Sequence, residues 1–187
     1  MASDSSGLWD KIFDAEMLRI NLTSCSLFIC AFEMFRDTVI SRPKTFFMDG
    51  FDKNGPITGE EYRNEVLSLD SNPFRASLRW FKKMDALSSE DLDTIDRIRK
   101  HRNELTHEMV RFVTESEKNL DVDLYQALIE IFIRLERWWF SWFETSVQPE
   151  SIPDGASSED VQSSQVMLLN HMLEIAVKLG KKGSRYH

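Results

Sequence analysis

The stretch SEDLDTIDRIRKHRNELTHEMVRFVTES, residues 89–116, decides the fold of this 187-residue chain. Its apolar residues recur at spacings of three, seven, four and three, as one face of a helix requires. They are Ile95, Ile98, Leu105, Met109 and Phe112. Ser88 or Ser89 stands at the expected N-cap, and acidic residues follow in the first turn, where the helix dipole favours them. The sequence therefore predicts one long helix that could reach Ser116.

The segments on either side are predicted to be helical as well. Thr58 with Glu61 reads as a capping box, Pro73 suits a first helical position, and Pro43 marks the limit of the first helix. The connector 44–56 carries turn signals, and Gly180 is a candidate C-cap. The predicted ranges are about 8–40, 58–72, 73–87, 121–147 and 158–180.

These segments predict an all-α fold, a bundle of five to six helices that are mostly long and antiparallel. No strand hairpin is expected. A chain of 187 residues has the size of one domain, so we expect a single helical domain over 1–187. Its core would span about 8–147, and the C-terminal helix about 158–180.

Composition and charge narrow the function classes. The formal net charge is −8, which argues against broad nonspecific binding to nucleic acid, because that needs a basic surface. Basic character is local: between 97 and 111, five Lys and Arg residues stand against two Glu residues. A local basic site therefore remains possible on an acidic protein.

The expected compartment is the cytoplasm, without a membrane anchor. Cys25 and Cys30 are five residues apart on one predicted helix, so they lie on different sides of it and a disulfide between them is not expected. Residues 1–7 lack a signal-peptide pattern. The longest apolar run, about Leu22 to Phe32, is short for a bilayer span and contains hydroxyl residues.

Arg102 is out of place on its helix. A rhythm of four and then three residues from Ile98 to Leu105 leaves position 102 for an apolar side chain, but an arginine stands there. A cation at the edge of a core costs desolvation unless a partner compensates. This cost suggests that Arg102 serves more than packing.

Asn103 and His107 complete a compact motif with Arg102. Arginine stays charged at physiological pH, and histidine exchanges protons near neutrality. On a straight helix, however, Arg102 and His107 point about 140° apart. Two copies meeting across a two-fold axis would bring both groups into one cleft, and a local kink is the other solution. Spacing alone does not choose between them.

Arg102-Asn103-x-x-x-His107 on a helix of an all-α bundle resembles the signature of the HEPN superfamily. That signature is an arginine, often followed by a polar residue, with a histidine four to six residues later. The resemblance implies a metal-independent endoribonuclease that works as a homodimer, with RNA as substrate and no cofactor or metal. Such proteins often act as toxins or antiviral effectors, frequently beside an antitoxin, commonly a nucleotidyltransferase.

The resemblance also implies roles for the three residues. His107 would be the general base on a ribose 2′-OH or the general acid toward the leaving 5′-oxygen. Arg102 would bind the scissile phosphate and offset its growing charge. Asn103 would orient His107 or bond a phosphate oxygen.

Other interpretations stay open. Arg102 could be a cation whose stem packs on a helix flank, and Asn103 and His107 could be exposed helical residues. The chain would then be a catalytically inactive module for dimerisation or partner binding, or a protein that binds RNA without cleaving it. His101, Glu104 and Glu108 share a face and could hold a metal, although no established metal motif contains them.

An aromatic cluster near the end of the predicted helix 121–147 is the other distinctive feature. Trp138 and Trp142 are four residues apart, as are Trp139 and Phe143, so two adjacent faces of the helix require burial. Core packing is the simplest interpretation, and a subunit interface is the alternative.

Overall fold

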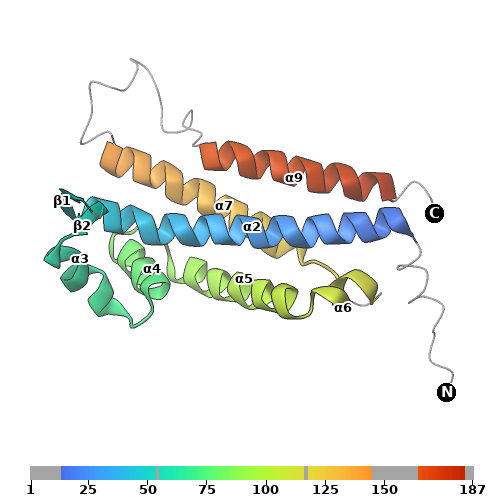
Figure 1. The fold of residues 1–187 in the computed structure, drawn as a ribbon, viewed down its shortest axis with the longest axis horizontal. Helices are drawn as coiled ribbons and strands as arrows, with labels where there is room; N and C mark the ends of the chain where they lie inside the picture. The colour runs from blue at the N-terminus through green and yellow to red at the C-terminus, as the bar shows by residue number, and fades with distance from the viewer. Residues whose placement is uncertain (1–13, 54, 116–117, 145–163, 184–187) are drawn as a thin grey trace, which may run out of the picture. The chain divides into compact units, whose positions relative to one another are not determined.

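The all-α prediction is confirmed. The computed structural model describes residues 14–53, 55–115, 118–144 and 164–183, and these are almost entirely helical (Figure 1). The α-helices are α2 (Ala15–Phe46), α3 (Glu60–Glu65), α4 (Pro73–Lys83), α5 (Ser89–His107), α6 (Met109–Thr114), α7 (Val122–Trp139) and α9 (Ser164–Gly183). A 3-10 turn, η1 (Leu67–Leu69), precedes α4, and a π-helical turn, η2 (Phe140–Glu144), extends α7.

The chain divides into two compact units. The first comprises residues 1–32 and 95–187, and the second comprises residues 33–94. Both α2 and α5 contribute to each unit. The assignment of 1–187 to a single domain stays a prediction.

The first unit is built around α5 and α7. The apolar stripe predicted on residues 95–112 is confirmed in most positions, since Ile95, Ile98, Leu105 and Phe112 are buried. Each such side chain contributes about 1.5–3 kcal/mol when fully buried. In the same unit α9 packs along α7 (Figure 1). Further buried residues come from α2, α7 and α9: Phe28, Phe32, Leu128, Phe132, Leu135 and Leu169.

The second unit is packed by aromatic side chains. Phe35 of α2 meets Phe74 of α4 edge to face, with ring centroids 6.2 Å apart. Trp80 of α4 is 2% exposed and contacts Phe46 and Phe47. These contacts bury one face of α4 against the end of α2.

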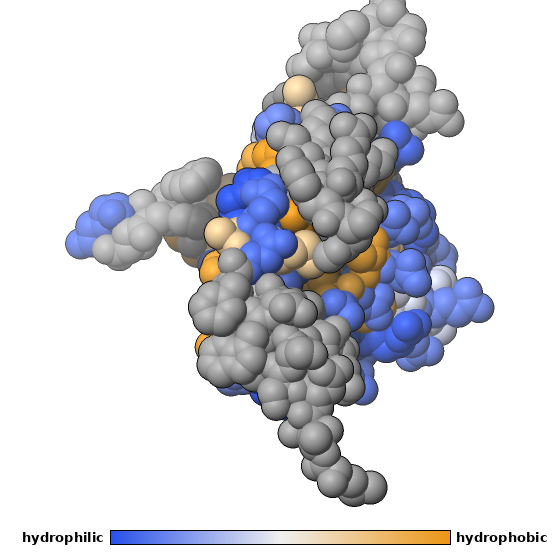
Figure 2. Space-filling view, turned by 90° about the vertical axis from the view of Figure 1, so that its right-hand side faces the viewer, coloured by the Kyte–Doolittle hydropathy of each residue, from blue (hydrophilic) through white to orange (hydrophobic). Residues whose placement is uncertain are grey.

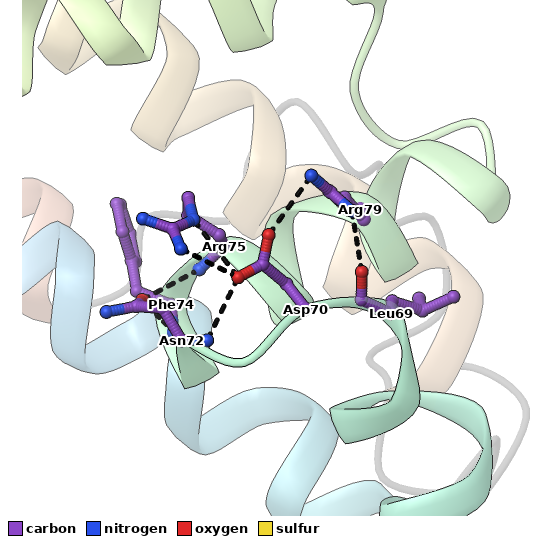
Figure 3. A network of polar contacts seen from close by, with 6 residues as sticks. All are labelled: Leu69, Asp70, Asn72, Phe74, Arg75 and Arg79. Carbon is purple, nitrogen blue, oxygen red and sulfur yellow. Dashed lines mark hydrogen bonds and ion pairs between the residues drawn. The ribbon is translucent and has the colours of Figure 1, made fainter.

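The start of α4 confirms the prediction for Pro73 and adds a polar network (Figure 3). The Asn72 side chain caps the helix by accepting hydrogen bonds from the N–H groups of Phe74 and Arg75. The Asp70 carboxylate pairs with Arg75 and Arg79, at 2.9 and 3.0 Å. The hydrogen bond from Arg75, first among several, lowers the Asp70 pKa to about 2. The network fixes the entry of the chain into α4.

A β-hairpin corrects the prediction that no strands would occur. β1 (Met48–Asp52) pairs antiparallel with β2 (Gly55–Thr58), inside the segment predicted to be a connector. The turn signals of segment 44–56 are also compatible with a hairpin, because short strands on either side of such a signal pair with each other. Gly50 has a φ of 152°, which disfavours other residues, and a register shift lies between Met48 and Gly50.

Several predicted helix ends were wrong. α2 continues through Pro43 to Phe46, because a proline near the last turn leaves few later hydrogen bonds to lose, and the Pro43 carbonyl still accepts from Phe47 N–H. Thr58 closes β2, so Gly59 precedes α3 without a side-chain cap. α4 ends at Lys83, and Asp85, two residues later, has a left-handed φ of 57°.

Downstream helix ends were partly right. Asp121 caps α7 by accepting from Leu124 N–H, but the α-helix gives way to the π-helical turn after Trp139. α9 passes the proposed C-cap Gly180 and ends at Gly183. Residue 158, where the last predicted helix begins, lies outside the described residues, as do residues 8–13 and 145–147.

By length and composition α2 could cross a membrane, which the short run from Leu22 to Phe32 did not indicate. A core helix of a soluble protein passes the same test, and α2 does bury Phe28, Ala31, Phe35 and Val39. Absence of a membrane anchor and a cytoplasmic location stay predictions. Hydrophilic and apolar patches adjoin on the face shown in Figure 2.

Candidate functional site

α5 carries the motif, and its start is set by a reciprocal cap. Ser88 Oγ accepts a hydrogen bond from Asp91 N–H, at 3.1 Å, and the Asp91 carboxylate accepts from Ser88 N–H, at 2.8 Å. Of the two serines proposed as the cap, Ser88 is therefore the right one. This cap and the buried stripe fix which side chains of α5 face the core.

His101 fills the core position that the sequence analysis gave to Arg102. It lies three residues after Ile98 and four before Leu105, so a rhythm of three and then four fits the stripe equally well. His101 is 9% exposed, whereas Arg102 is half-buried. The core position between Ile98 and Leu105 therefore belongs to His101, and Arg102 lies at the edge of the stripe, as expected for a cation there.

The Arg102 guanidinium contacts Asn103 and Phe32. Its Nη1 donates a hydrogen bond to Asn103 Oδ1 at 3.2 Å. Its Cζ lies over the Phe32 ring, 5.7 Å from the centroid, within the range of a cation–π contact. These contacts offset part of the desolvation that the sequence analysis identified. The structure thus brings Arg102 and Asn103 together and adds Phe32, which sequence reasoning missed.

His107 is exposed and is the last residue of α5. Glu108 leaves the helical region, with φ −119° and ψ 23°, and α6 begins at Met109. The predicted continuous helix to Ser116 was therefore wrong, and Ser116 itself lies outside the described residues. Glu108 accepts through its carbonyl from the N–H groups of Arg111 and Phe112, which starts the new turn.

The break does not bring Arg102 and His107 together. It follows His107, whereas the residues between 102 and 107 belong to the regular part of α5. Over five helical residues the chain advances about 7.5 Å and turns a net of about 140°. The kink proposed from sequence lies beyond the motif, so within one copy the two side chains point away from each other.

Much of the local basic charge is paired. Arg99 and Lys100 both bind the Asp96 carboxylate, at 2.7 and 2.8 Å, and their hydrogen bonds, Lys100's first, lower the pKa of Asp96. Arg111 binds Glu108 and Glu115, at 2.7 and 2.8 Å. Extending the count to residues 96–115 gives five basic against four acidic residues. The motif is therefore less cationic than its immediate sequence indicated.

His101 is a structural residue that links α5 to the start of α7. Its Nε2 accepts a hydrogen bond from Asp121 N–H at 3.1 Å, so the ring is neutral with its proton on Nδ1. Its ring meets Phe28 and Phe112 edge to face, with centroids 5.1 and 5.7 Å apart. Burial is the main cause that lowers the His101 pKa, although the charges of Asp121 and Glu104 oppose it.

The alternative metal face is not assembled. His101 Nδ1 lies 3.9 Å from Glu104 Oε2, and Glu108 is engaged by Arg111 and Lys118. Among the described residues, no group of three or more His, Cys, Asp or Glu side chains could hold a metal ion.

The aromatic cluster spans the end of α7 and η2. Trp138 and Trp142 stack with centroids 5.1 Å apart and an interplanar angle of 11°. Trp139 is 2% exposed, and its ring centroid lies 5.0 Å from that of Phe143. Trp138, Trp142 and Phe143 are half-buried. The residues spaced by four are thus in ring contact, and core packing holds for Trp139.

Comparison of the chain with family models, with curated proteins and with solved structures gave no match.

Proposed function

We propose that this protein is a metal-independent endoribonuclease of the HEPN type. The observation that carries the proposal is the state of the motif on α5. Arg102 is oriented by Asn103 and Phe32 at the edge of the core, and His107 stands exposed at the helix end. An oriented cation and an accessible imidazole are the two groups that RNA cleavage without a metal requires.

The chemistry is an internal transesterification. The ribose 2′-oxygen attacks phosphorus while the bond from phosphorus to the 5′-oxygen breaks, which leaves a 2′,3′-cyclic phosphate and a free 5′-hydroxyl. His107 accepts the 2′-OH proton as general base, or donates a proton to the 5′-oxygen as general acid. Arg102 binds the phosphate oxygens, where negative charge increases in the transition state. Asn103 keeps the guanidinium in place through its amide oxygen.

We propose further that the active form is a homodimer. In one copy Arg102 and His107 diverge by about 140° on a regular helix. Two α5 helices that meet across a two-fold axis place an arginine from one copy near a histidine from the other. The composite cleft then holds both groups around one phosphodiester.

The biological role that fits such an enzyme is that of a cytoplasmic toxin or antiviral effector, with an antitoxin such as a nucleotidyltransferase as its partner. This role is supported only by the resemblance of the motif. It predicts that growth of a bacterial host slows when the protein is expressed and that this effect requires Arg102 and His107.

The first prediction concerns cleavage by the purified protein in EDTA. Arg102→Ala and His107→Ala should each reduce the rate by about 100-fold or more, because each removes a group that acts on the reacting phosphate. Gel analysis of a mixed RNA substrate gives the rate, and end-group analysis should find the cyclic phosphate. Circular dichroism checks that the variants are folded.

Arg97→Ala and His171→Ala are matched controls, because Arg97 and His171 are exposed residues of the same types on α5 and α9. Both controls should cleave like the wild type. Cleavage that persists in His107→Ala, or that EDTA abolishes, contradicts the proposal.

The same two variants test the homodimer. Each is inactive as a homodimer, but a mixed dimer retains one arginine and one histidine in the shared cleft. Mixing Arg102→Ala with His107→Ala under exchange conditions should therefore restore part of the activity. A wild-type protein that cleaves RNA as a monomer by sedimentation analysis rules out the composite site.

An inactive partner-binding module is the second candidate. It is favoured by the ion pairs of Asp96, Glu108 and Glu115, which neutralise most cations near the motif on a chain of net charge −8. This alternative predicts a folded protein that leaves RNA intact and whose stability is kept or raised by Arg102→Leu. Loss of cleavage without loss of stability in that variant supports the enzyme instead.

A further inference from the structure

The ring of Phe32 sits beneath the guanidinium that the motif depends on. Phe32 belongs to α2 and is 3% exposed, so its position is fixed by the core of the first unit. Arg102 comes from α5 and is half-buried. Two residues 70 positions apart in sequence are thus joined by a contact of 5.7 Å between Cζ and the ring centroid.

We propose that Phe32 is a positioning residue for Arg102. This inference rests on the proposed ribonuclease function and extends it to a residue outside the motif. The electron-rich face of the ring attracts the cation and restricts its movement, whereas an aliphatic side chain would only exclude water. The face of the ring attracts the cation without accepting any of its N–H donors in a conventional hydrogen bond.

The contacts with Asn103 and Phe32 restrain the guanidinium relative to different helices. Asn103 is the next residue on the same helix, so its amide oxygen restrains the guanidinium only relative to α5. Phe32 restrains it relative to α2, a separate helix, and residues 32 and 102 belong to the same unit. A long arginine side chain loses considerable rotamer entropy when it is fixed, and a preoriented one loses less on binding phosphate. Loss of the Phe32 contact should therefore lower kcat.

A fluorine substitution separates the two properties of the ring. Replacing Phe32 with pentafluorophenylalanine keeps the apolar side chain and approximately its shape, but reverses the charge distribution of the ring face. We expect kcat for RNA cleavage to fall about tenfold with little change in KM, as for loss of a desolvated cation–π contact that orients a group. The kcat of the Phe32→Leu variant should fall at least as far.

Phe35 supplies the matched control. It lies three residues further along α2, is fully buried, and packs on Phe74 in the second unit. Pentafluorophenylalanine at position 35 should leave kcat within about twofold of the wild type, since Phe35 packs on the Phe74 ring and lies outside the motif. An equal loss at both positions contradicts the proposal, because it would report disturbed packing.

A double-mutant cycle decides whether Phe32 acts through Arg102. Phe32→Leu should lower residual cleavage no further in the Arg102→Ala background, because the cation is already gone. Additive losses would show an independent role and overturn the proposal.

A second cycle on urea unfolding uses the same four proteins and needs no substrate. Coupling between positions 32 and 102 in that cycle shows that ring and cation interact, and its absence overturns the contact. If the wild type cleaves no RNA, the ribonuclease proposal fails and the positioning role fails with it, but the unfolding cycle still measures the contact.

Discussion

At the scale of single residues, the neighbours His101 and Arg102 show how one position of register separates a core group from a surface group. Both fit between Ile98 and Leu105 with spacings of three and four, so periodicity alone could not assign the core position. A contact with Asp121, the N-cap of α7, distinguishes the two positions. The Asp121 N–H needs an acceptor, and the imidazole of His101 supplies one. That contact is 20 residues away in sequence and has no local signal.

The pH dependence of stability follows from His101. Because burial lowers its pKa in the folded state, the unfolded chain takes up a proton first as the pH falls. The free energy of unfolding is therefore unaffected by His101 titration above the unfolded pKa of about 6.5, and it decreases as the pH falls below that value. His101→Gln keeps an acceptor but cannot be charged, so its urea unfolding should depend less on pH between about 7.5 and 5.5.

At pH 7.5 the His101→Gln variant should also be less stable by about 1–3 kcal/mol, since the packing against two aromatic rings is lost. His107→Gln is the control, because that residue is exposed, and it should retain the wild-type pH dependence. If both variants lose the pH dependence equally, His101 is not its source.

At the scale of elements, several helix starts followed from local sequence, although the capping box predicted at Thr58 was wrong because Thr58 belongs to β2. The starts at Ser88, Pro73 and Asp121 depend only on residues within the next turn of the helix, so they can be predicted from local sequence. The end of α5 at His107 has no glycine or proline to announce it, and depends on the conformation of Glu108 and its ion pairs with Arg111 and Lys118.

The cap of α5 can be tested directly. Ser88→Ala removes the acceptor for Asp91 N–H and should lower the free energy of unfolding by about 1 kcal/mol. Ser89→Ala is the matched control, because Ser89 is the exposed first residue of the helix and alanine is well tolerated there. Urea unfolding measures both, and an equal effect of the two changes would mean that Ser88 is not the cap.

At the scale of the whole molecule, charge pairing would govern the binding of the proposed RNA substrate. Net charge was predictable from composition, and so was the all-α fold, because helical periodicity recurs along most of the chain. The pairing was less accessible: Asp96 and Glu115 lie just outside the basic stretch 97–111 and compensate part of it. The division into two units and the hairpin likewise depend on contacts that composition does not encode.

Weak dependence on salt should result from this pairing. With few free cations near the motif, RNA binding should displace only about one or two counterions per protomer. A plot of log K against log salt concentration, measured by fluorescence anisotropy, should therefore have a slope of magnitude about 1–2 per protomer. A slope of about 6 or more would indicate a broad basic surface, at odds with the ion pairs observed.

The fixed tautomer of His101 makes it a spectroscopic reporter. With Nε2 accepting from a backbone amide, its proton resides on Nδ1, next to the residue that the proposed chemistry depends on. Nitrogen chemical shifts distinguish the two tautomers of an imidazole. Labelled histidine would therefore report the state of His101, the residue before Arg102 in sequence, without any introduced probe.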